Sequence, residues 1–345
     1  MKRASRALLF LSIFGILFAE FLHAFSFHYD ERIKSFYQLK KGTADVVFLG
    51  CSHTYRNIDP SVLWEKYGYT GYDLGSPAQW TSLSYYQMKE AIKAQHPKVI
   101  VYEAYKCYHQ KEYPEEAVTV KAVSGIRDLQ NKWQAITANV EDPDQRIYYF
   151  LEFPWFHSRY EELKAADFAP AKKEELSDCY LGYDPYFASV PTDMDGAAEV
   201  TEVKPLSDKT LYYLDEMRRL AAENDCEFML LLTPYKLDFS KKQPYYNALE
   251  QYARENNVPF FNMDYMFDEI GLDEETDIGR SRHLSLSGAY KVTEYLADYM
   301  HEHYDLTDHR GQKGYERWEE NAALLGEYRS GTKVTEEKTE DEAAE

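Results

Sequence analysis

The sequence predicts an α/β fold in which helices cover both faces of a parallel sheet. Short apolar runs that suit buried strands alternate with segments of helical spacing, and the connections between them are short. This alternation occurs twice, before and after a long stretch of different composition. Parallel strands must be joined by crossovers, usually helical, and such sheets are buried on both faces. The 345 residues suffice for one large domain of this kind or two small ones.

The first alternation spans residues 44–104. Strands are expected at 44–50, 69–75 and 98–104. Asp59 and Pro60 predict a helix start, with Asp as the N-cap and Pro at the first helical position. Helical spacing returns over 82–95. Residues 44–104 therefore have the order β-α-β-α-β.

The alternation resumes after an interruption. Helices are expected at 207–224, 243–256 and 287–304, and strands at 227–233 and 259–263. The interruption, 105–205, is rich in aromatic and charged residues, and we interpret it as a mostly helical insertion, since long insertions between elements are usually functional. The expected organisation is a signal segment at 1–28, an α/β domain in two parts at 29–104 and 206–306, and an extension at 307–345 with a disordered acidic tail.

The charge balance excludes some partners. Lys and Arg number 39 against 59 Asp and Glu, a formal net charge of -20. Nucleic acid binding depends on clustered cations that contact phosphates, so we expect no nucleic acid partner. The folded body is expected to avoid anionic lipid headgroups for the same reason.

The cysteines and histidines do not form a metal motif. The four cysteines are widely spaced without a C-x-x-C pair, which excludes a zinc ribbon and a thioredoxin-like motif. Cys51 and Cys107 follow strands that are candidates for neighbours, so a disulfide and two buried thiols are both open. His301 and His303 are two apart and do not share a helix face. We expect no metal and no cofactor.

The N-terminus indicates export. Lys2, Arg3 and Arg6 precede an uninterrupted apolar run over 7–19, and the apolar character continues to Phe27. The full segment is long enough to span a membrane with its N-terminus in the cytoplasm. A cleaved signal peptide is the alternative, although Leu22 does not fit the small-residue cleavage pattern. Either way the body is expected outside the cytoplasm, anchored by a single pass or secreted.

Candidate catalytic residues lie where the expected strands end, because ligands of open α/β sheets bind beyond the carboxyl ends of the strands. Ser52 follows the first strand and is the candidate nucleophile, and His283 precedes the last helix and is the candidate general base. The backbone N–H groups of Ser52 and Gly75 are the candidate oxyanion donors. His53 either orients the site or caps the turn.

Three runs of sequence resemble the SGNH/GDSL hydrolase superfamily. DVVFLGCSHTYRNIDP is similar to its first block, YDLGSPAQ to its second, and HLSLSGAYKVTEYL to the block with the catalytic His. The resemblance covers 44–104 and 227–305 and is strongest to membrane-anchored envelope members related to alginate-acetylation and D-alanyl-teichoic acid proteins. It implies a flavodoxin-like three-layer αβα sandwich and a Ser-His-Asp triad acting on acyl esters, often of envelope polysaccharides.

The chain departs from that family pattern at two positions. The triad Asp would stand three residues before His283, where this chain has Arg280, and Asp277 is the nearest carboxylate. The family's Asn oxyanion donor is also absent, and Gln79 or Lys106 is the candidate substitute. A Ser-His dyad, a triad rearranged through Asp277 and a degenerate site that only binds are all open.

These observations predict an extracytoplasmic serine esterase or O-acyltransferase that acts on acyl esters of a cell-envelope polysaccharide or similar polymer. A membrane-bound O-acyltransferase is an expected partner. The alternative is a catalytically degenerate module that binds glycan or scaffolds such an acyltransferase, and Arg280 is the residue that favours it.

Overall fold

The structure is a computed structural model. It describes residues 2–24, 31–152, 155, 160–161, 180–190, 200–235 and 239–333. Its centre is a five-stranded sheet in the order β2-β1-β3-β4-β5, and all neighbouring strands pair in parallel. The strands are β1 (Val46–Gly50), β2 (Gly71–Gly75), β3 (Val99–Glu103), β4 (Glu227–Leu232) and β5 (Phe260–Asn262).

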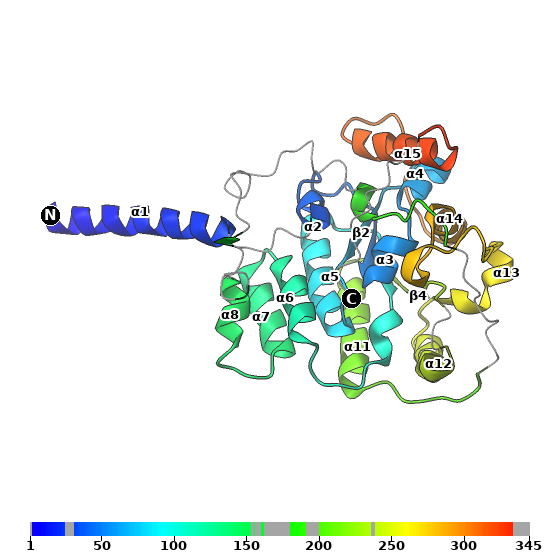
Figure 1. Cartoon of the computed structure of the whole chain (residues 1–345), viewed down its shortest axis with the longest axis horizontal. Coiled ribbons are helices and arrows are strands. Elements are labelled where there is room, and N and C mark those ends of the chain that lie inside the picture. The colour runs from blue at the N-terminus through cyan, green and yellow to red at the C-terminus, as the bar shows by residue number, and fades with distance from the viewer. Residues whose placement is uncertain are drawn as a thin grey trace.

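Helices and short 3-10 turns surround this sheet (Figure 1). The α-helices are α1 (Lys2–Ala24), α2 (Glu31–Phe36), α3 (Ser52–Asn57), α4 (Ser61–Tyr67), α5 (Thr81–Gln95), α6 (Glu116–Ser124), α7 (Leu129–Asn139), α8 (Arg146–Leu151), α11 (Asp208–Ala222), α12 (Phe239–Glu255), α13 (Phe267–Ile270), α14 (Leu286–His303) and α15 (Glu316–Arg329). The 3-10 turns are η1 (Tyr105–Tyr108), η4 (Tyr180–Gly182), η5 (Met263–Tyr265) and η6 (Arg280–Arg282).

The predicted fold class is confirmed. The strand order is that of a flavodoxin-like doubly wound sheet, in which the chain leaves β1 for β2 and then crosses back to β3. The carboxyl ends of β1 and β3 therefore form the topological switch point where such folds bind ligands. Each strand overlaps the run predicted for it, although each observed strand is one or two residues shorter.

Alternating strand residues pack into two separate cores, which explains why the strands are apolar throughout. Val47 and Leu49 of β1 lie in a core with side chains of α5, α11 and α12. Val46 and Phe48 point to the other face and pack with side chains of α4, α14 and α15. Each fully buried aliphatic or aromatic side chain of this size contributes about 1.5–3 kcal/mol to folding. The sheet edge that carries the site is thus fixed from both faces.

A third core joins α6, α7 and α8 to the outer side of α5. It contains Leu83 of α5, Val123 of α6, Ile136 of α7 and Tyr149 of α8. These helices make up much of the described part of 105–205, which was predicted to be mostly helical. The division of the chain into domains stays a prediction, and the predicted disordered tail from 334 onward lies outside the described residues.

One predicted helix start is displaced by a residue. The helix predicted to begin at Pro60 with Asp59 as its cap begins at Ser61, and Pro60 is the N-cap. Asp59 still caps it from one position further back, because its Oδ1 accepts from the Ser61 N–H at 3.0 Å and from the Ser61 hydroxyl at 2.6 Å. The sequence therefore correctly identified Asp59 as the residue that caps this helix, and only the first helical residue differs.

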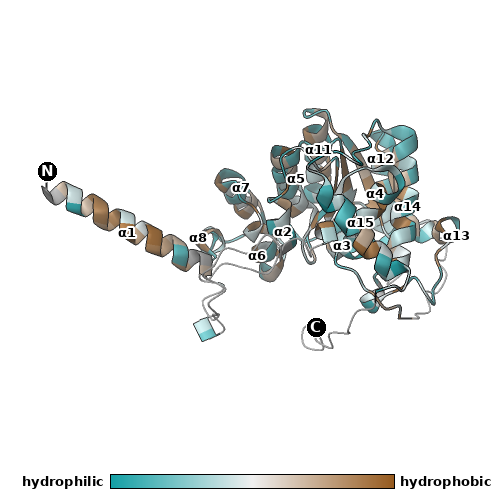
Figure 2. Ribbon diagram, turned by 90° about the horizontal axis from the view of Figure 1, so that it is seen from above, coloured by the Kyte–Doolittle hydropathy of each residue, from teal (hydrophilic) through white to brown (hydrophobic). Residues whose placement is uncertain are grey.

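The N-terminal helix α1 extends away from the body as a mostly apolar rod (Figure 2). Among the described residues it is the helix long and apolar enough to cross a membrane, with a window at Ala4–Phe21 of mean hydropathy 1.7. A signal sequence has the same properties, so both readings of the N-terminus remain compatible with it.

Candidate active site

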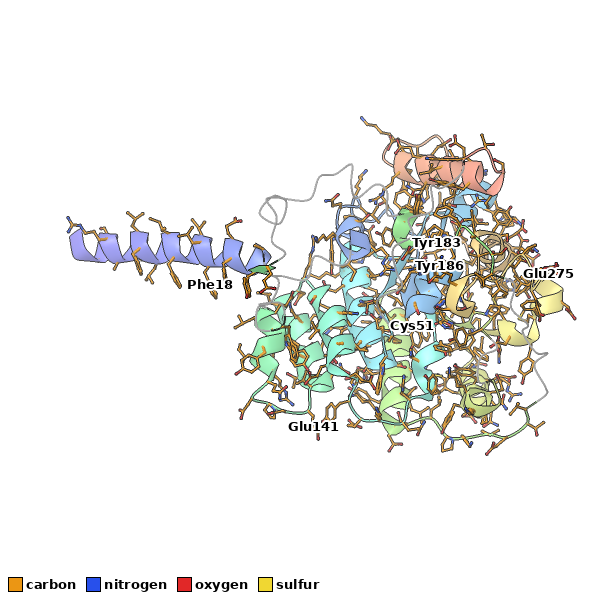
Figure 3. All side chains as sticks on the ribbon, viewed as in Figure 1. Phe18, Cys51, Glu141, Tyr183, Tyr186 and Glu275 are labelled. Carbon is orange, nitrogen blue, oxygen red and sulfur yellow. The ribbon has the colours of Figure 1, made fainter. Side chains whose placement is uncertain are left out.

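Ser52 lies at a sharp turn between β1 and α3, where it is the first helical residue and half-buried. The turn requires the glycine at position 50, whose φ is +148°. A Cβ there would lie 2.5 Å from the Thr54 hydroxyl and 2.7 Å from the Glu103 carbonyl oxygen. Because glycine has no side chain, the chain can turn tightly here and present the Ser52 hydroxyl at the switch point. Figure 3 labels Cys51, the residue before Ser52.

His283 meets Ser52 across the edge of the sheet. Its Nε2 lies 3.0 Å from the Ser52 Oγ, although the two residues are 231 positions apart. A short loop presents the ring: Ile278 and Leu284 form an antiparallel bridge, and the Gly279 N–H donates to the His283 carbonyl oxygen at 2.7 Å. The predicted nucleophile and base are therefore brought within hydrogen-bond distance.

Burial keeps the His283 ring neutral. The pKa of His283 is lowered to about 4, chiefly by desolvation and also by the positive charge of Arg56. The carbonyls of Arg280 and Ser281 oppose this, because they favour the protonated ring. At neutral pH the imidazole is unprotonated on one nitrogen and can accept a proton from the Ser52 hydroxyl.

Asp277 does not contact His283, contrary to the rearranged triad considered above. Its buried carboxylate accepts hydrogen bonds from the Ser287 hydroxyl at 2.6 Å, the Lys291 ammonium at 2.6 Å and the Asp273 N–H at 2.8 Å. The Nδ1 of His283 is buried and makes no hydrogen bond within the described part of the chain. Asp277 therefore anchors the start of α14, and among the described residues no carboxylate bonds to the ring that touches Ser52.

Asn57 holds the backbone next to His283. Its side chain is fully buried, its Oδ1 accepts from the Leu284 N–H at 2.9 Å, and its Nδ2 donates to the Thr233 hydroxyl at 2.8 Å. Asn57 ends the helix that Ser52 begins. One side chain thus ties the nucleophile's helix, the end of β4 and the base-bearing loop together.

His53 faces a buried carboxylate instead of the nucleophile. Its Nδ1 lies 3.8 Å from Glu103 Oε1 and its ring stacks on Tyr105 with 3.8 Å between centroids. The ring is T-shaped to that of His283, with a centroid distance of 4.9 Å. Burial lowers the pKa of His53 well below its usual value, and His283 and Lys106 add to this. His53 is therefore a neutral ring packed behind the Ser52–His283 pair.

Sequence reasoning missed Glu103. It ends β3 fully buried and accepts hydrogen bonds from the N–H groups of Thr233 and Tyr105, each at 3.4 Å. Burial raises the pKa of Glu103 to about 8, so the carboxyl group is protonated at neutral pH. The sequence did carry a signal for Glu103, because it is an acidic residue at the end of an otherwise apolar strand.

Of the other predicted oxyanion donors, Gly75 lies next to the turn that carries Ser52, and its role stays a prediction, whereas Gln79 is engaged elsewhere. Gly75 ends β2 beside Gly50, and a Cβ on it would lie 2.7 Å from the Gly50 carbonyl oxygen. The buried Gln79 amide donates both of its hydrogens elsewhere, to Ser84 at 2.8 Å and Gln87 at 3.0 Å. With both donors used, Gln79 has none left for an oxyanion.

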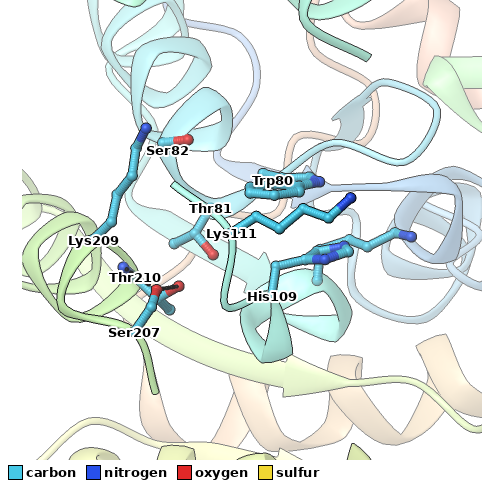
Figure 4. A pocket seen from close by; sticks show the side chains of 9 residues that line it. Trp80, Thr81, Ser82, His109, Lys111, Ser207, Lys209 and Thr210 are labelled. Carbon is cyan, nitrogen blue, oxygen red and sulfur yellow. Dashed lines mark hydrogen bonds between the residues drawn. The ribbon is translucent and has the colours of Figure 1, made fainter. Parts of the chain in front are cut away.

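Lys106 lines a small pocket beside the site, together with Trp80, Thr81, His109 and Lys209 among others (Figure 4). Its volume of about 10 Å³ is close to the space that one water molecule occupies. The pocket is therefore no substrate cavity. Whether Lys106 donates to an oxyanion stays a prediction.

Cys51 and Cys107 are free buried thiols, so the disulfide left open above does not form in this structure. Burial raises the pKa of both thiols. They are inert by this criterion, because thiolates are the reactive form. No group of metal-binding side chains occurs within the residues that the structure describes.

Comparison with known proteins leaves the family open. No family model matches the chain, and no curated protein matches it. A crystal structure of a proposed acylhydrolase from Bacteroides fragilis is 13% identical, with a TM-score of 0.39 over 80% of this chain and 96% of that chain. A GDSL-like lipase from Bacteroides thetaiotaomicron is 14% identical, with a TM-score of 0.35 over 74% and 87%. TM-scores this low decide neither family nor function.

The fold and the site define a class by their own geometry. A doubly wound sheet carries a hydroxyl nucleophile on the turn after β1 and a neutral imidazole 3.0 Å from it. That pair is the arrangement by which serine hydrolases and acyltransferases form an acyl-enzyme. Within the described part of the chain, no carboxylate takes the orienting place of the usual triad.

Proposed function

We propose that this chain is a serine esterase or O-acyltransferase with a Ser52–His283 dyad, acting on acyl esters of an extracytoplasmic polysaccharide or similar envelope polymer. The observation that carries the proposal is the 3.0 Å contact between the Ser52 Oγ and the His283 Nε2 at the switch point of the sheet. The three motif resemblances in the sequence support the same chemistry.

The reaction follows from the roles of the two side chains. The Ser52 Oγ attacks the acyl carbonyl carbon while its proton passes to the His283 Nε2. The imidazolium then donates that proton to the leaving alcohol oxygen as the carbon–oxygen bond breaks, which leaves the acyl group on Ser52. Water or a sugar hydroxyl attacks the acyl-enzyme, gives its proton to His283, and the proton returns to Ser52.

The oxyanion formed in each attack needs donors at the carboxyl ends of β1 and β2. The N–H groups of Ser52 and Gly75 are our candidates, because they lie on the turns that flank the nucleophile. The absence of a carboxylate on the His283 Nδ1 predicts a slow enzyme, since loss of that orienting group costs up to about ten-thousandfold in the triad template.

A second function has one observation in its favour. Because the His283 Nδ1 makes no hydrogen bond of normal geometry within the described residues, only the nearby carbonyls of Arg280 and Ser281 favour a proton on the ring, and its tautomer is weakly fixed. A site of this kind that no longer turns over would bind glycan or hold a membrane acyltransferase in place.

The location is proposed from the N-terminal helix. With α1 as a single-pass anchor, the active body would lie outside the cytoplasm, within reach of envelope polymers and of a membrane-bound O-acyltransferase.

Turnover of a chromogenic acetyl ester by the full chain, with and without sugar acceptors, tests the proposal. We expect hydrolysis or transfer of acetyl to the acceptor, read by absorbance and by mass spectrometry, and loss of both in Ser52→Ala. Equal turnover in Ser52→Ala would refute the enzyme. The binding function would instead leave Ser52→Ala fully active in cells.

A further inference from the structure

Exposed apolar side chains concentrate on the outer helices of the insertion. Leu129 and Trp133 of α7 are 66% and 42% exposed, and Ile147 and Tyr148 of α8 are 44% and 47% exposed. The other large exposed apolar side chains of the described body lie outside these two helices, and Tyr212 among them lines a hollow with Trp133. They are Tyr160, Val190, Val203, Tyr212 and Tyr265.

Three of these side chains form a strip together with the half-buried Phe150. Leu129 and Trp133 are four residues apart and share a face of α7. The Trp133 ring contacts Phe150 of α8, with 5.7 Å between centroids, and Ile147 lies three residues before Phe150 on the same helix. We call Leu129, Trp133, Ile147 and Phe150 the α7–α8 strip. Patches of this kind on soluble bodies mark contact surfaces.

The chain itself brings this strip close to the end of the candidate anchor. Only residues 25–30 separate α1 from α2, a reach of about 25 Å at full extension. Ile33 of α2 packs against Gly125 at the end of α6, where an added Cβ would lie 2.4 Å from its Cδ1. The Tyr37 hydroxyl also donates to the Gly125 carbonyl oxygen at 3.3 Å. The helices α6, α7 and α8 therefore lie on the side of the body from which α1 leaves (Figure 1).

The polar surroundings suit the edge of a bilayer. Trp133 lines a hollow of about 490 Å³ together with Tyr85, Tyr212 and Lys89. Tryptophan, tyrosine and lysine are the side chains that gather at membrane–water interfaces, because each joins an apolar body to a polar end. The exposed Glu141, Asp142 and Asp144 follow α7 in the loop before α8, and Figure 3 shows Glu141 at the lower end of the body, away from α1.

We propose that the α7–α8 strip rests on the surface of the bilayer that holds α1, and so fixes the orientation of the catalytic body. The strip would enter the headgroup region, while α1 supplies the attachment. This inference rests on the proposed anchor but is independent of the Ser52 chemistry.

Trp133 makes a direct test possible. The other tryptophans with described side chains are Trp64, Trp80 and Trp318, each at most 5% exposed, and Trp155, which is half-buried. The full chain would be reconstituted in phosphatidylcholine vesicles with and without bromine on the upper acyl chain, which quenches only nearby indole rings. We expect brominated lipid to lower the emission, and Trp133→Phe to remove most of that decrease.

A matched control uses Tyr265, which is 46% exposed and follows β5 at the opposite edge of the sheet. Tyr265→Trp combined with Trp133→Phe moves the reporter there, and bromine should not quench it. Equal quenching of wild type and Trp133→Phe would overturn the docking proposal. So would the absence of quenching in vesicle-bound wild type, which would mean that a second copy or a sugar covers the strip. If the chain does not float with the vesicles in a density gradient, both the anchor and the docking proposal are overturned. Ester turnover that depends on Ser52 in the same sample would show that the proposed enzyme function is unaffected by that failure.

Discussion

The two histidines of the site each have one of the two contacts that the histidine of a catalytic triad makes. His283 touches the nucleophile, with 3.0 Å from its Nε2 to the Ser52 Oγ, but none of the carboxylates that the structure describes bonds to its other nitrogen. His53 has a carboxyl group 3.8 Å from its Nδ1, that of Glu103, but its ring lies behind the pair. The difference teaches that contact with the nucleophile and proximity to a carboxylate are separate properties, and that only the first selects the base.

The largest predicted effect separates the two histidines. His283→Gln should lower kcat/KM for an acyl ester by about a hundredfold to ten-thousandfold, because it removes the general base. His53→Gln should lower it by less than about tenfold, since this ring only packs against the site. Both variants are compared by steady-state kinetics after circular dichroism shows that they are folded. A reversed order would make His53 the base.

The next effect tests how the base is held without a carboxylate. Asn57→Ala removes the hydrogen bonds to Leu284 and Thr233, so kcat should fall by up to about a hundredfold through misplacement of His283, with KM little changed. Unfolding free energy should fall by about 1–3 kcal/mol, because buried partners lose their hydrogen bonds.

Two variants control for the loss of a buried amide. Asn139 is equally buried but binds Ser82 in the third core, so Asn139→Ala should lose stability and keep kcat. Asn57→Asp should recover much of the rate, because a carboxylate can accept from Leu284 and from the Thr233 hydroxyl. A loss of kcat equal to that of Asn139→Ala would remove Asn57 from the site.

The Glu103 side of the comparison predicts a pH-dependent stability. Its raised pKa of about 8 means that the folded chain holds a proton which the unfolded chain has already released. Its contribution is therefore fully present below the ordinary Glu pKa and falls by about 1.4 kcal/mol per pH unit up to about pH 8. Glu103→Gln should flatten this slope in urea unfolding at several pH values, and an unchanged slope would contradict the raised pKa.

The low pKa of His283 predicts that kcat/KM falls only at unusually low pH. With a pKa of about 4, His283 is deprotonated across most of the range in which an exposed His would titrate. The midpoint of the acid limb of kcat/KM should lie well below the ordinary His value of about 6.5. A midpoint near that value, in protein that stays folded, would mean that the ring is more solvated than the structure shows.

The sequence predicted what depends on local pattern. Short apolar runs located the strands, and the rule that ligands bind at their carboxyl ends selected Ser52 and His283. Asp277 was a candidate triad carboxylate because it is close to His283 in the sequence, but the two side chains point in different directions. The Ile278–Leu284 bridge turns the loop so that the carboxylate faces α14 and Lys291, while the ring faces Ser52.

The remaining site residues depend on contacts between distant segments. Asn57 meets Leu284 and Thr233 from positions 227 and 176 residues away, which no local pattern reports. The Gln79 amide has its partners within eight residues, yet only the path of the turn before α5 decides that both donors are used there. The surroundings of Glu103 depend on the strand order, which places β3 between β1 and β4, so that its carboxyl group meets Cys51 and Thr233 at the ends of those strands.

The most direct test of the central claim is covalent labelling of the folded full chain with a serine-directed fluorophosphonate, read by intact mass and peptide mapping. Stoichiometric modification of Ser52, lost in His283→Gln and kept in His53→Gln, is the predicted result. No labelling of the folded protein between about pH 6 and 9, or labelling that survives His283→Gln, would contradict an activated Ser52–His283 dyad.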